Sequence, residues 1–364
     1  QHGTQSLNLE PIVSPMVKYF ACVLEPGDII QVMERAWHEA MDGRKGPVWI
    51  DMPVDVQNRQ VPEAAEGGPL PSRAAVSPDL AAIAQGLARA EKPLILAGGG
   101  VRSAGAAAQL NRLCQTLQIP AALSRGGIDV MASSSPYFVG RPGSYGDRAS
   151  HFAIQQCDYL LILGSRLSIS TTGYYPQRFG QNAHKVMVDI DQLELDKPDV
   201  PVDVKLCMDL KDFLEGLCGC CEGLDPVDHG AWLAHCQEMR RQYPNVQPGY
   251  AQEHPLNSYY FTHKLSQCAP AECSIVVDTG SVCNIVSQSW ELKEGQRYLI
   301  SGGLSAMGFW AGAIGAVQEG RQVLALSGDG SVQMNVQEFA TLHYYQLPIK
   351  LFVFQNSGYM LIRH

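Results

Sequence analysis

One stretch near the end of this 364-residue sequence constrains the fold more than any other. The apolar run 323–326 is typical of a buried strand, ends at the turn GDGS (328–331), and is followed by a helical pattern and a second buried strand, 349–354. A strand–helix–strand crossover makes the two strands parallel, so both should end at the same sheet edge. Asp329 and Asn356 should therefore lie at neighbouring strand ends, where open α/β sheets bind ligands.

The residue types at these two strand ends suit a metal held together with a phosphate. Asp329 offers a carboxylate oxygen and Asn356 an amide oxygen, which a loop carbonyl and phosphate oxygens would complete into an octahedral Mg²⁺ site. The glycines allow close backbone approach, and the following helix presents free N–H groups to an anion. An isolated GDG is more often a simple turn. Because Asn356 follows the second strand, we favour a metal and phosphate site over a simple turn.

Composition narrows the class of protein. The length predicts two or three domains, and 46% hydrophobic residues, 17% charged residues and 35 glycines are typical of an α/β protein with many tight turns. The net charge of −9 and the lack of a basic run argue against nucleic acid as the main partner. No apolar stretch approaches about 20 residues, so no membrane span is expected. Most of the 11 cysteines lie in apolar patterns, which favours reduced thiols and a cytoplasmic protein.

One group of cysteines invites a zinc hypothesis. It contains no paired C-x2-C spacing, so we favour a tolerated loop cluster over a metal site. Its members and neighbours are Cys207, Cys218, Cys220, Cys221, His229, His235 and Cys236.

The first 60 residues predict a single crossover. A short loop leads to a helix over 26–41 and a strand over 48–51, which is too little for a domain. Residues 61–75 are rich in Pro, Glu, Ala and Gly without periodicity, which indicates a linker.

Alternating helices and strands then predict a doubly wound parallel sheet. Helices are expected over 78–90 and 106–117, and strands over 93–97, 121–123, 159–163 and 185–190. The turn Gly98-Gly99-Gly100 follows the first strand but lacks the full G-x-G-x-x-G pattern, so it supports NAD binding only weakly.

A third region begins after a polar connector. A helix over 258–267 and a strand over 274–278 lead to Thr279-Gly280-Ser281, a turn that could bind phosphate through backbone N–H groups. The string LISGGLSAMGFWAGAIGA (299–316) predicts a helix rich in Gly and Ala, which would allow close approach of a ligand or a partner helix.

Three strings resemble one family in the right order: GRKGPVWIDMPVDVQ (43–57), SGGLSAMGF (301–309) and GDGSVQMN…QNSGY (328–359). They resemble acetolactate-synthase-like thiamine-diphosphate enzymes. The implied fold is α/β with doubly wound parallel sheets and a Rossmann-like middle domain. The implied domains are the end of a pyrimidine-binding domain (1–60), a linker (61–75), the middle domain (76–222), a connector (223–253) and an incomplete diphosphate- and Mg²⁺-binding domain (254–364).

The resemblance also implies roles for individual residues. Asp329, Asn356 and the Gly358 carbonyl would hold Mg²⁺. Met307 would wedge the cofactor into a bent conformation, and the Ser305 carbonyl would accept a hydrogen bond from its 4′-amino group. The other implied cofactor contacts are Gly280, Ser281, Gly302, Gly303, Gly330 and Ser331. Some members of the family also hold FAD, near positions that match Gly143, Gly146 and Arg166.

The implied chemistry is attack of the thiamine-diphosphate ylid on a 2-keto acid, followed by carbon–carbon bond formation or aldehyde release. The family places its active site between subunits, so a homodimer or homotetramer is expected. Its activating glutamate would precede Gln1, so we expect the given residues to be part of a longer enzyme and not competent alone.

Two alternatives remain. A nucleotide-binding oxidoreductase would use the Gly98–Gly100 turn, but the sequence offers no convincing acidic residue for a ribose. A catalytically incomplete scaffold of the same fold would not need the metal ligands, and the presence of Asp329 and Asn356 argues against it.

Overall fold

The computed structural model describes residues 7–62, 78–224, 228–317 and 321–363. It divides into two compact units, Gln1–Ser77 and Pro78–His364. The elements of the first unit are α1 (Glu10–Val13), η1 (Ser14–Met16), β1 (Tyr19–Cys22), η2 (Pro26–Asp28), α2 (Ile29–Met41), β2 (Val48–Asp51) and α3 (Val54–Gln57).

The first unit contains a two-stranded parallel sheet. β1 pairs with β2 from Tyr19 opposite Val48 to Cys22 opposite Asp51. The predicted strand 48–51 is confirmed, whereas the loop expected before residue 26 is wrong, because it contains β1. β1 has only four residues and no predicted helix before it, whereas β2, of the same length, follows the helix predicted over 26–41.

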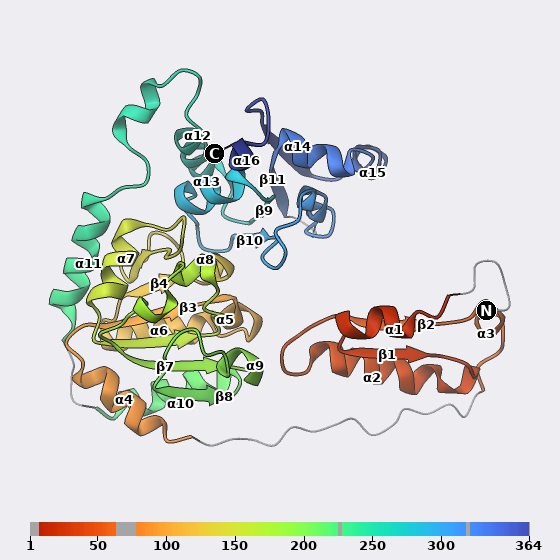
Figure 1. Ribbon diagram of the computed structural model, residues 1–364, viewed down its shortest axis with the longest axis horizontal. Helices are drawn as coiled ribbons and strands as arrows, with labels where there is room; N and C mark the ends of the chain where they lie inside the picture. Colours follow the sequence, from red (N-terminus) through yellow and green to blue (C-terminus); the bar gives the residue numbers. More distant parts are fainter. Residues whose placement is uncertain (1–6, 63–77, 225–227, 318–320, 364) are drawn as a thin grey trace. The chain divides into compact units, whose positions relative to one another are not determined.

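The second unit begins with a six-stranded parallel sheet in the order β5-β4-β3-β6-β7-β8. This is the strand order of the doubly wound dinucleotide-binding fold, so the predicted fold class is confirmed. The strands are β3 (Pro93–Ala97), β4 (Ala121–Leu123), β5 (Phe138–Gly140), β6 (Tyr159–Leu163), β7 (His184–Asp189) and β8 (Val204–Cys207). Figure 1 labels β3, β4, β7 and β8 of this sheet.

Helices cover both faces of this middle sheet. α4 (Leu80–Arg89), α6 (Ala107–Leu117) and α10 (Leu210–Glu222) pack with Ile95 in one core. On the other face, α7 (Arg148–Gln156), α9 (Gln192–Leu195) and α11 (Gly230–Gln242) pack with Leu94 and Leu96. Successive side chains of β3 therefore enter opposite cores, as the strand repeat of two requires. The remaining elements are α5 (Gly99–Ser103), η3 (Arg125–Val130), α8 (Ile169–Thr172), η4 (Pro176–Arg178) and η5 (Pro248–Gln252).

Cys218, Cys220 and Cys221 lie on α10 and not on a loop, which corrects the sequence prediction. Cys218 and Cys221 are buried in the core beneath that helix. Burial, reinforced by neighbouring thiols, raises the pKa of Cys221 to about 12. The thiol thus stays protonated near neutral pH, as expected of a core side chain.

A second sheet follows, with four parallel strands in the order β10-β9-β11-β12. Its strands are β9 (Cys273–Val277), β10 (Arg297–Ile300), β11 (Gln322–Gly328) and β12 (Ile349–Phe354). α12 (Ser258–Cys268) and α13 (Ser281–Ser289) precede and follow β9. The predicted crossover is confirmed, since β11 pairs with β12 in parallel. Its helical part is broken into α14 (Asp329–Val332), η7 (Gln333–Asn335) and α15 (Glu338–Tyr345), and α16 (Met360–Arg363) ends the described chain.

The helix predicted over 299–316 is wrong. The first two residues end β10, a turn follows at 302–304, and only η6 (Phe309–Ala313), a 3₁₀ helix, forms within the stretch. Ser305 and Gly308 adopt positive φ angles of 52° and 90°, which an α-helix does not allow. The high glycine content lowers helix propensity further.

Among the described residues, the helices are too short or too polar for any of them to cross a membrane.

Candidate functional site

The crevice of the second sheet lies where its strand order changes direction. β9 and β11 are neighbours, while β10 lies beyond β9 and β12 beyond β11. Chain segments leaving β9 and β11 therefore diverge, and the carboxyl ends of such strands are where open α/β sheets bind ligands. Both predicted phosphate turns, at Gly280 and at Gly330, follow these two strands.

The turn after β9 is open. Gly280 has a φ angle of 84°, and a Cβ atom added there would meet no atom within 4 Å. Gly280 is also the N-cap of α13, and no side chain caps that helix. The first N–H groups of this nine-residue helix thus lack a side-chain acceptor, which is the arrangement that binds anions.

The turn after β11 is closely packed around its glycine. The Asp329 carboxylate accepts a hydrogen bond from the Gly330 N–H at 2.9 Å. A Cβ atom added at Gly330 would lie 2.5 Å from Cε1 of Tyr359, so a larger residue here would require the half-exposed Tyr359 side chain to move. Ser331 is buried.

Asp329 and Asn356 end neighbouring strands. Gly328 pairs with Phe354 in the register, so Asp329 lies one residue and Asn356 two residues beyond the last pair. Asn356 is exposed, and Ser357 and Gly358 both have positive φ angles, which turn the chain after β12. Within the described ranges no group of three or more His, Cys, Asp or Glu side chains could hold a metal. A metal here would thus need the Asn356 amide, a carbonyl and ligand oxygens besides Asp329.

The segment that carries Ser305 and Met307 is exposed but fixed at one end. Gly302, Gly303 and Ser305 are exposed, and Met307 retains 36% of its accessible surface. Directly after Met307, the Gly308 carbonyl accepts a hydrogen bond from Nδ2 of Asn335 at 2.8 Å. Asn335 belongs to η7, which follows the GDGS turn, so the two segments are in contact.

Sequence reasoning missed Asp278 as a site residue. It follows β9, is fully buried, and accepts hydrogen bonds from segments on both sides of the crevice. An acidic residue directly after an apolar strand and before Thr-Gly-Ser was the available signal. Asn335 was missed as well, since nothing in the sequence indicates its contact with Gly308.

The three residues matched to a flavin site have protein partners. Gly143 and Gly146 form a tight turn in which the Gly146 N–H donates to the Gly143 carbonyl at 2.8 Å. A Cβ atom added at Gly146 would lie 2.5 Å from the Arg141 carbonyl oxygen, so packing explains this glycine. Nε of Arg166 lies 3.2 Å from the buried carboxylate of Glu194, while about half of the Arg166 side chain stays exposed.

The crevice of the middle sheet, between β3 and β6, is filled by backbone. A Cβ atom added at Gly100 would lie 2.7 Å from Cα of Gly164, and one added at Gly98 would overlap the Gly164 carbonyl. The Gly98 N–H also donates to the Leu163 carbonyl at 2.8 Å. The Gly98–Gly100 turn thus joins two strand ends.

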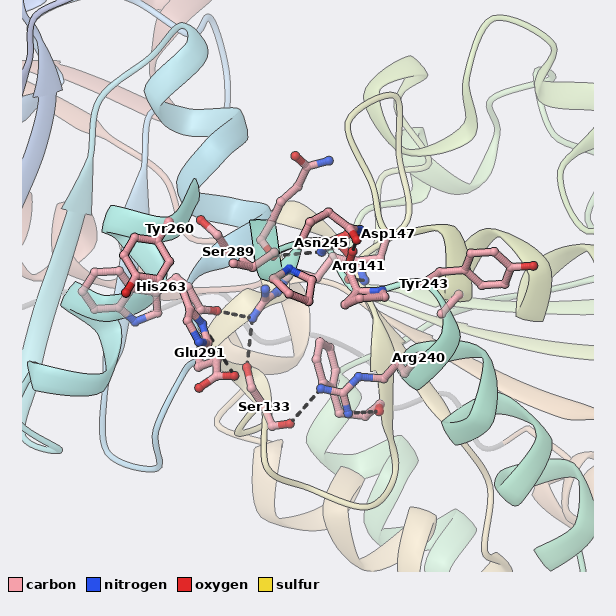
Figure 2. Close-up of a pocket in the computed structure, with 18 of the residues that line it drawn as sticks. Ser133, Arg141, Asp147, Arg240, Tyr243, Asn245, Tyr260, His263, Ser289 and Glu291 are labelled. Atoms are coloured by element: carbon pink, nitrogen blue, oxygen red, sulfur yellow. Dashed lines mark hydrogen bonds and ion pairs between the residues drawn. The ribbon is translucent and has the colours of Figure 1, made fainter. Parts of the chain in front are cut away.

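A separate cavity of about 400 Å³ lies between the middle and final domains (Figure 2). Buried Arg141 donates to the Ser133 hydroxyl and to the Ser287 and Trp290 carbonyls at 2.8–3.2 Å. The cavity is not lined by any of the residues predicted to bind a cofactor. Arg141 thus serves to join the two domains.

The comparisons with known proteins agree with this architecture. The family model for the thiamine pyrophosphate enzyme central domain matches residues 80–217. The model for the thiamine pyrophosphate enzyme C-terminal TPP binding domain matches residues 278–364. The chain therefore belongs to the thiamine pyrophosphate enzymes, and its final domain is a thiamine-pyrophosphate-binding domain.

The relatives narrow this class. The chain is 31% identical over 367 residues to the acetolactate synthase isozyme 1 large subunit of Escherichia coli, covering 98% of this chain and 63% of the relative. It is 30% identical to the acetolactate synthase large subunit of Lactococcus lactis, covering 97% and 62%. The resemblance to acetolactate-synthase-like enzymes is confirmed, and the oxidoreductase alternative is not favoured. The chain spans about three fifths of the length of these relatives.

Proposed function

We propose that this chain supplies the middle and diphosphate-binding domains of a thiamine-diphosphate-dependent decarboxylase or carboligase that acts on a 2-keto acid. The observation that carries the proposal is the placement of Asp329 and Asn356 at the ends of paired strands β11 and β12. The two family matches and the similarity to acetolactate synthases support it.

Mg²⁺ and the cofactor diphosphate would share the crevice. Asp329, Asn356 and the Gly358 carbonyl are the proposed metal ligands, because carboxylate, amide and carbonyl oxygens are what Mg²⁺ prefers. The uncapped start of α13 at Gly280 and Ser281 and the backbone at Gly330 and Ser331 would bind the diphosphate.

The remaining residues would position the thiamine end. Met307 would pack against its apolar surface, and the Ser305 carbonyl would accept a hydrogen bond from its amino group. Gly302 and Gly303 would allow close approach of the backbone. When bound, thiamine diphosphate supplies a nucleophilic carbon and an electron sink for decarboxylation.

Release of CO₂ tests the activity. The full-length protein with thiamine diphosphate and Mg²⁺ should release CO₂ from pyruvate or another simple 2-keto acid, and NMR of the products should distinguish an aldehyde from a carboligation product. Asp329→Ala should abolish this release, while Lys350→Ala, an exposed substitution on β12, should retain it. Failure to release CO₂ from any 2-keto acid tested, despite cofactor binding, would refute the proposed reaction.

FAD is a second cofactor hypothesis. It rests on the half-exposed guanidinium of Arg166, which could contact a phosphate, because packing explains Gly146. A flavin absorption band in the purified full-length protein that is lost in Arg166→Met would support it, and a colourless protein that gains no band with added FAD would refute it.

A homo-oligomer with the cofactor between subunits is also proposed. Leu304 retains 95% of its accessible surface, and the neighbouring Met307 is also exposed, so the segment beside the crevice presents apolar side chains that another surface would cover. Light scattering of the full-length protein should give a dimer or tetramer, and a monomer that is active would contradict the proposal.

A further inference from the structure

The Asp278 carboxylate accepts four hydrogen bonds at the crevice. It follows β9 and has no accessible surface. Its carboxylate accepts hydrogen bonds from the Ser327 hydroxyl at 2.7 Å and the Thr279 N–H at 2.8 Å. It also accepts from the N–H groups of Phe309 at 3.2 Å and Trp310 at 3.3 Å.

These donors belong to three different segments, and each segment carries a proposed cofactor contact. Thr279 directly precedes Gly280 and Ser281, and Ser327 precedes the GDGS turn by one residue. Phe309 and Trp310 start η6, directly after Met307 and Gly308. One carboxylate thus joins the diphosphate turn, the metal turn and the Met307 segment.

The four contacts need a carboxylate. An ionised Asp accepts at about four lone-pair positions and has no hydrogen to donate, whereas an Asn side chain has one oxygen and an NH₂ that would face a donor. Burial of a carboxylate is costly unless hydrogen bonds compensate it. Four hydrogen bonds at one buried carboxylate therefore indicate that these segments must be held together.

A second contact fixes the same segment independently. Nδ2 of Asn335 donates to the Gly308 carbonyl at 2.8 Å. Gly308 has a φ angle of 90°, and a Cβ atom added there would lie 2.6 Å from Nδ2 of Asn335. These contacts hold residues 308–310, so they fix the end of the Met307 segment that follows Met307.

We propose that Asp278 is a positioning residue that sets the Met307 segment relative to the two diphosphate turns, so that both ends of thiamine diphosphate are bound at once. This role rests on the proposed function. Asp278 would not touch the cofactor. It would act through the backbone of residues 279, 309 and 310 and through Ser327.

The test compares two ligands in the full-length protein with Mg²⁺: thiamine diphosphate, which would contact all three segments, and inorganic pyrophosphate, which would contact the two turns only. Asp278→Asn should raise the Kd for thiamine diphosphate at least about tenfold, and more than the Kd for pyrophosphate. Asn335→Ala should raise the Kd for thiamine diphosphate and leave that for pyrophosphate within about twofold.

Asp129→Asn is the matched control. Asp129 is another buried carboxylate, paired with Arg297 at 2.6 Å and bonded to the Tyr298 N–H at 3.2 Å, outside the three segments. Its loss should lower the Tm but leave both Kd values within about twofold. Asp278→Asn with wild-type Kd values would overturn the proposal, as would equal increases for both ligands.

If Asp278→Asn does not fold, Ser327→Ala tests the proposal instead, because it removes one of the four hydrogen bonds to the Asp278 carboxylate. It should raise the Kd for thiamine diphosphate about threefold, and an unchanged Kd would overturn the proposal. A wild-type protein that binds pyrophosphate but not thiamine diphosphate would instead overturn the proposed function, so the two failures are distinguishable.

Discussion

The middle sheet and the final sheet differ in what lies at the crevice where the strand order changes direction. Both are parallel, and both have a crevice where the strand order changes direction. In the middle sheet the glycines after β3 pack against the backbone of Gly164 after β6. In the final sheet Gly280 opens onto free space, and Asp278 and Asp329 stand at the strand ends. A glycine turn after a strand thus indicates that another group lies close to the backbone. The polar residues beside the turn indicate whether that group is a ligand or the protein's own backbone.

The largest expected effect follows from this packing. Gly98→Ala would place Cβ onto the Gly164 carbonyl, which belongs to rigid backbone at a neighbouring strand end. We expect a loss of about 3–5 kcal/mol in the free energy of unfolding, measured by urea denaturation.

The matched control for Gly98 is Gly219→Ala. Gly219 lies within α10, and its added Cβ would meet no atom within 4 Å. Removing glycine from a helix interior should stabilise the protein by about 0.5–1 kcal/mol. Equal changes in the free energy of unfolding for Gly98→Ala and Gly219→Ala would contradict the claim that backbone packs against Gly98 and leaves Gly219 free of contact.

Arg141→Met tests the junction between the two domains. It removes three hydrogen bonds from a buried guanidinium and leaves two carbonyls and a hydroxyl without this donor. Burial lowers the pKa of Arg141, and the nearby Asp147 charge acts in the opposite direction. We expect a loss of about 2–4 kcal/mol in stability. Arg178→Met, at an exposed position, should change stability by less than about 0.5 kcal/mol in the same denaturation experiment.

Asn356→Ala tests the second metal ligand. Loss of one neutral oxygen ligand should raise the apparent Kd for Mg²⁺ about tenfold, or about 1.4 kcal/mol, in a titration at fixed thiamine diphosphate. Lys350→Ala on the same strand should leave it unchanged. An unchanged Kd in Asn356→Ala would remove Asn356 from the metal site.

The smallest effect is expected at Gly280. Gly280→Ala meets no steric obstacle, but a φ angle of 84° costs a residue with a Cβ atom about 1 kcal/mol. We expect this loss in urea denaturation, with binding of pyrophosphate weakened about fivefold at most. A loss as large as that of Gly98→Ala would contradict the open crevice.

Most of the fold followed from patterns in the sequence. Strands such as Pro93–Ala97 and Ile349–Phe354 are continuous apolar runs, as expected of strands covered on both faces, and their bounds agree with the prediction. β1, β5, β8 and β10 were not predicted, because each has only three or four residues; strands this short were predicted only at β2 and β4, which each follow a predicted helix. The helix expected over 299–316 failed because Ser305 and Gly308 have positive φ angles, and residues 308 and 309 are instead held by contacts with Asn335 and Asp278.

The candidate site likewise has one part that the sequence predicts and another part that only the structure reveals. The position of Asp329 beside Asn356 follows from local patterns, because a parallel crossover fixes it. The ties from Asp278 to Phe309 and from Asn335 to Gly308 span 31 and 27 residues and connect irregular segments. No periodicity marks such contacts, so they emerged only from the structure.

Binding of thiamine diphosphate in the presence of Mg²⁺ tests the central claim most directly. At a ligand concentration of about 100 times the Kd, the wild-type full-length protein should gain about 2.7 kcal/mol of stability, seen as a rise in Tm. Asp329→Ala should fold normally, because among the described residues the Asp329 carboxylate makes only the local hydrogen bond to the Gly330 N–H, and it should lose this rise. No rise in the wild type, or an equal rise in Asp329→Ala, would contradict the assignment of this crevice as the cofactor site.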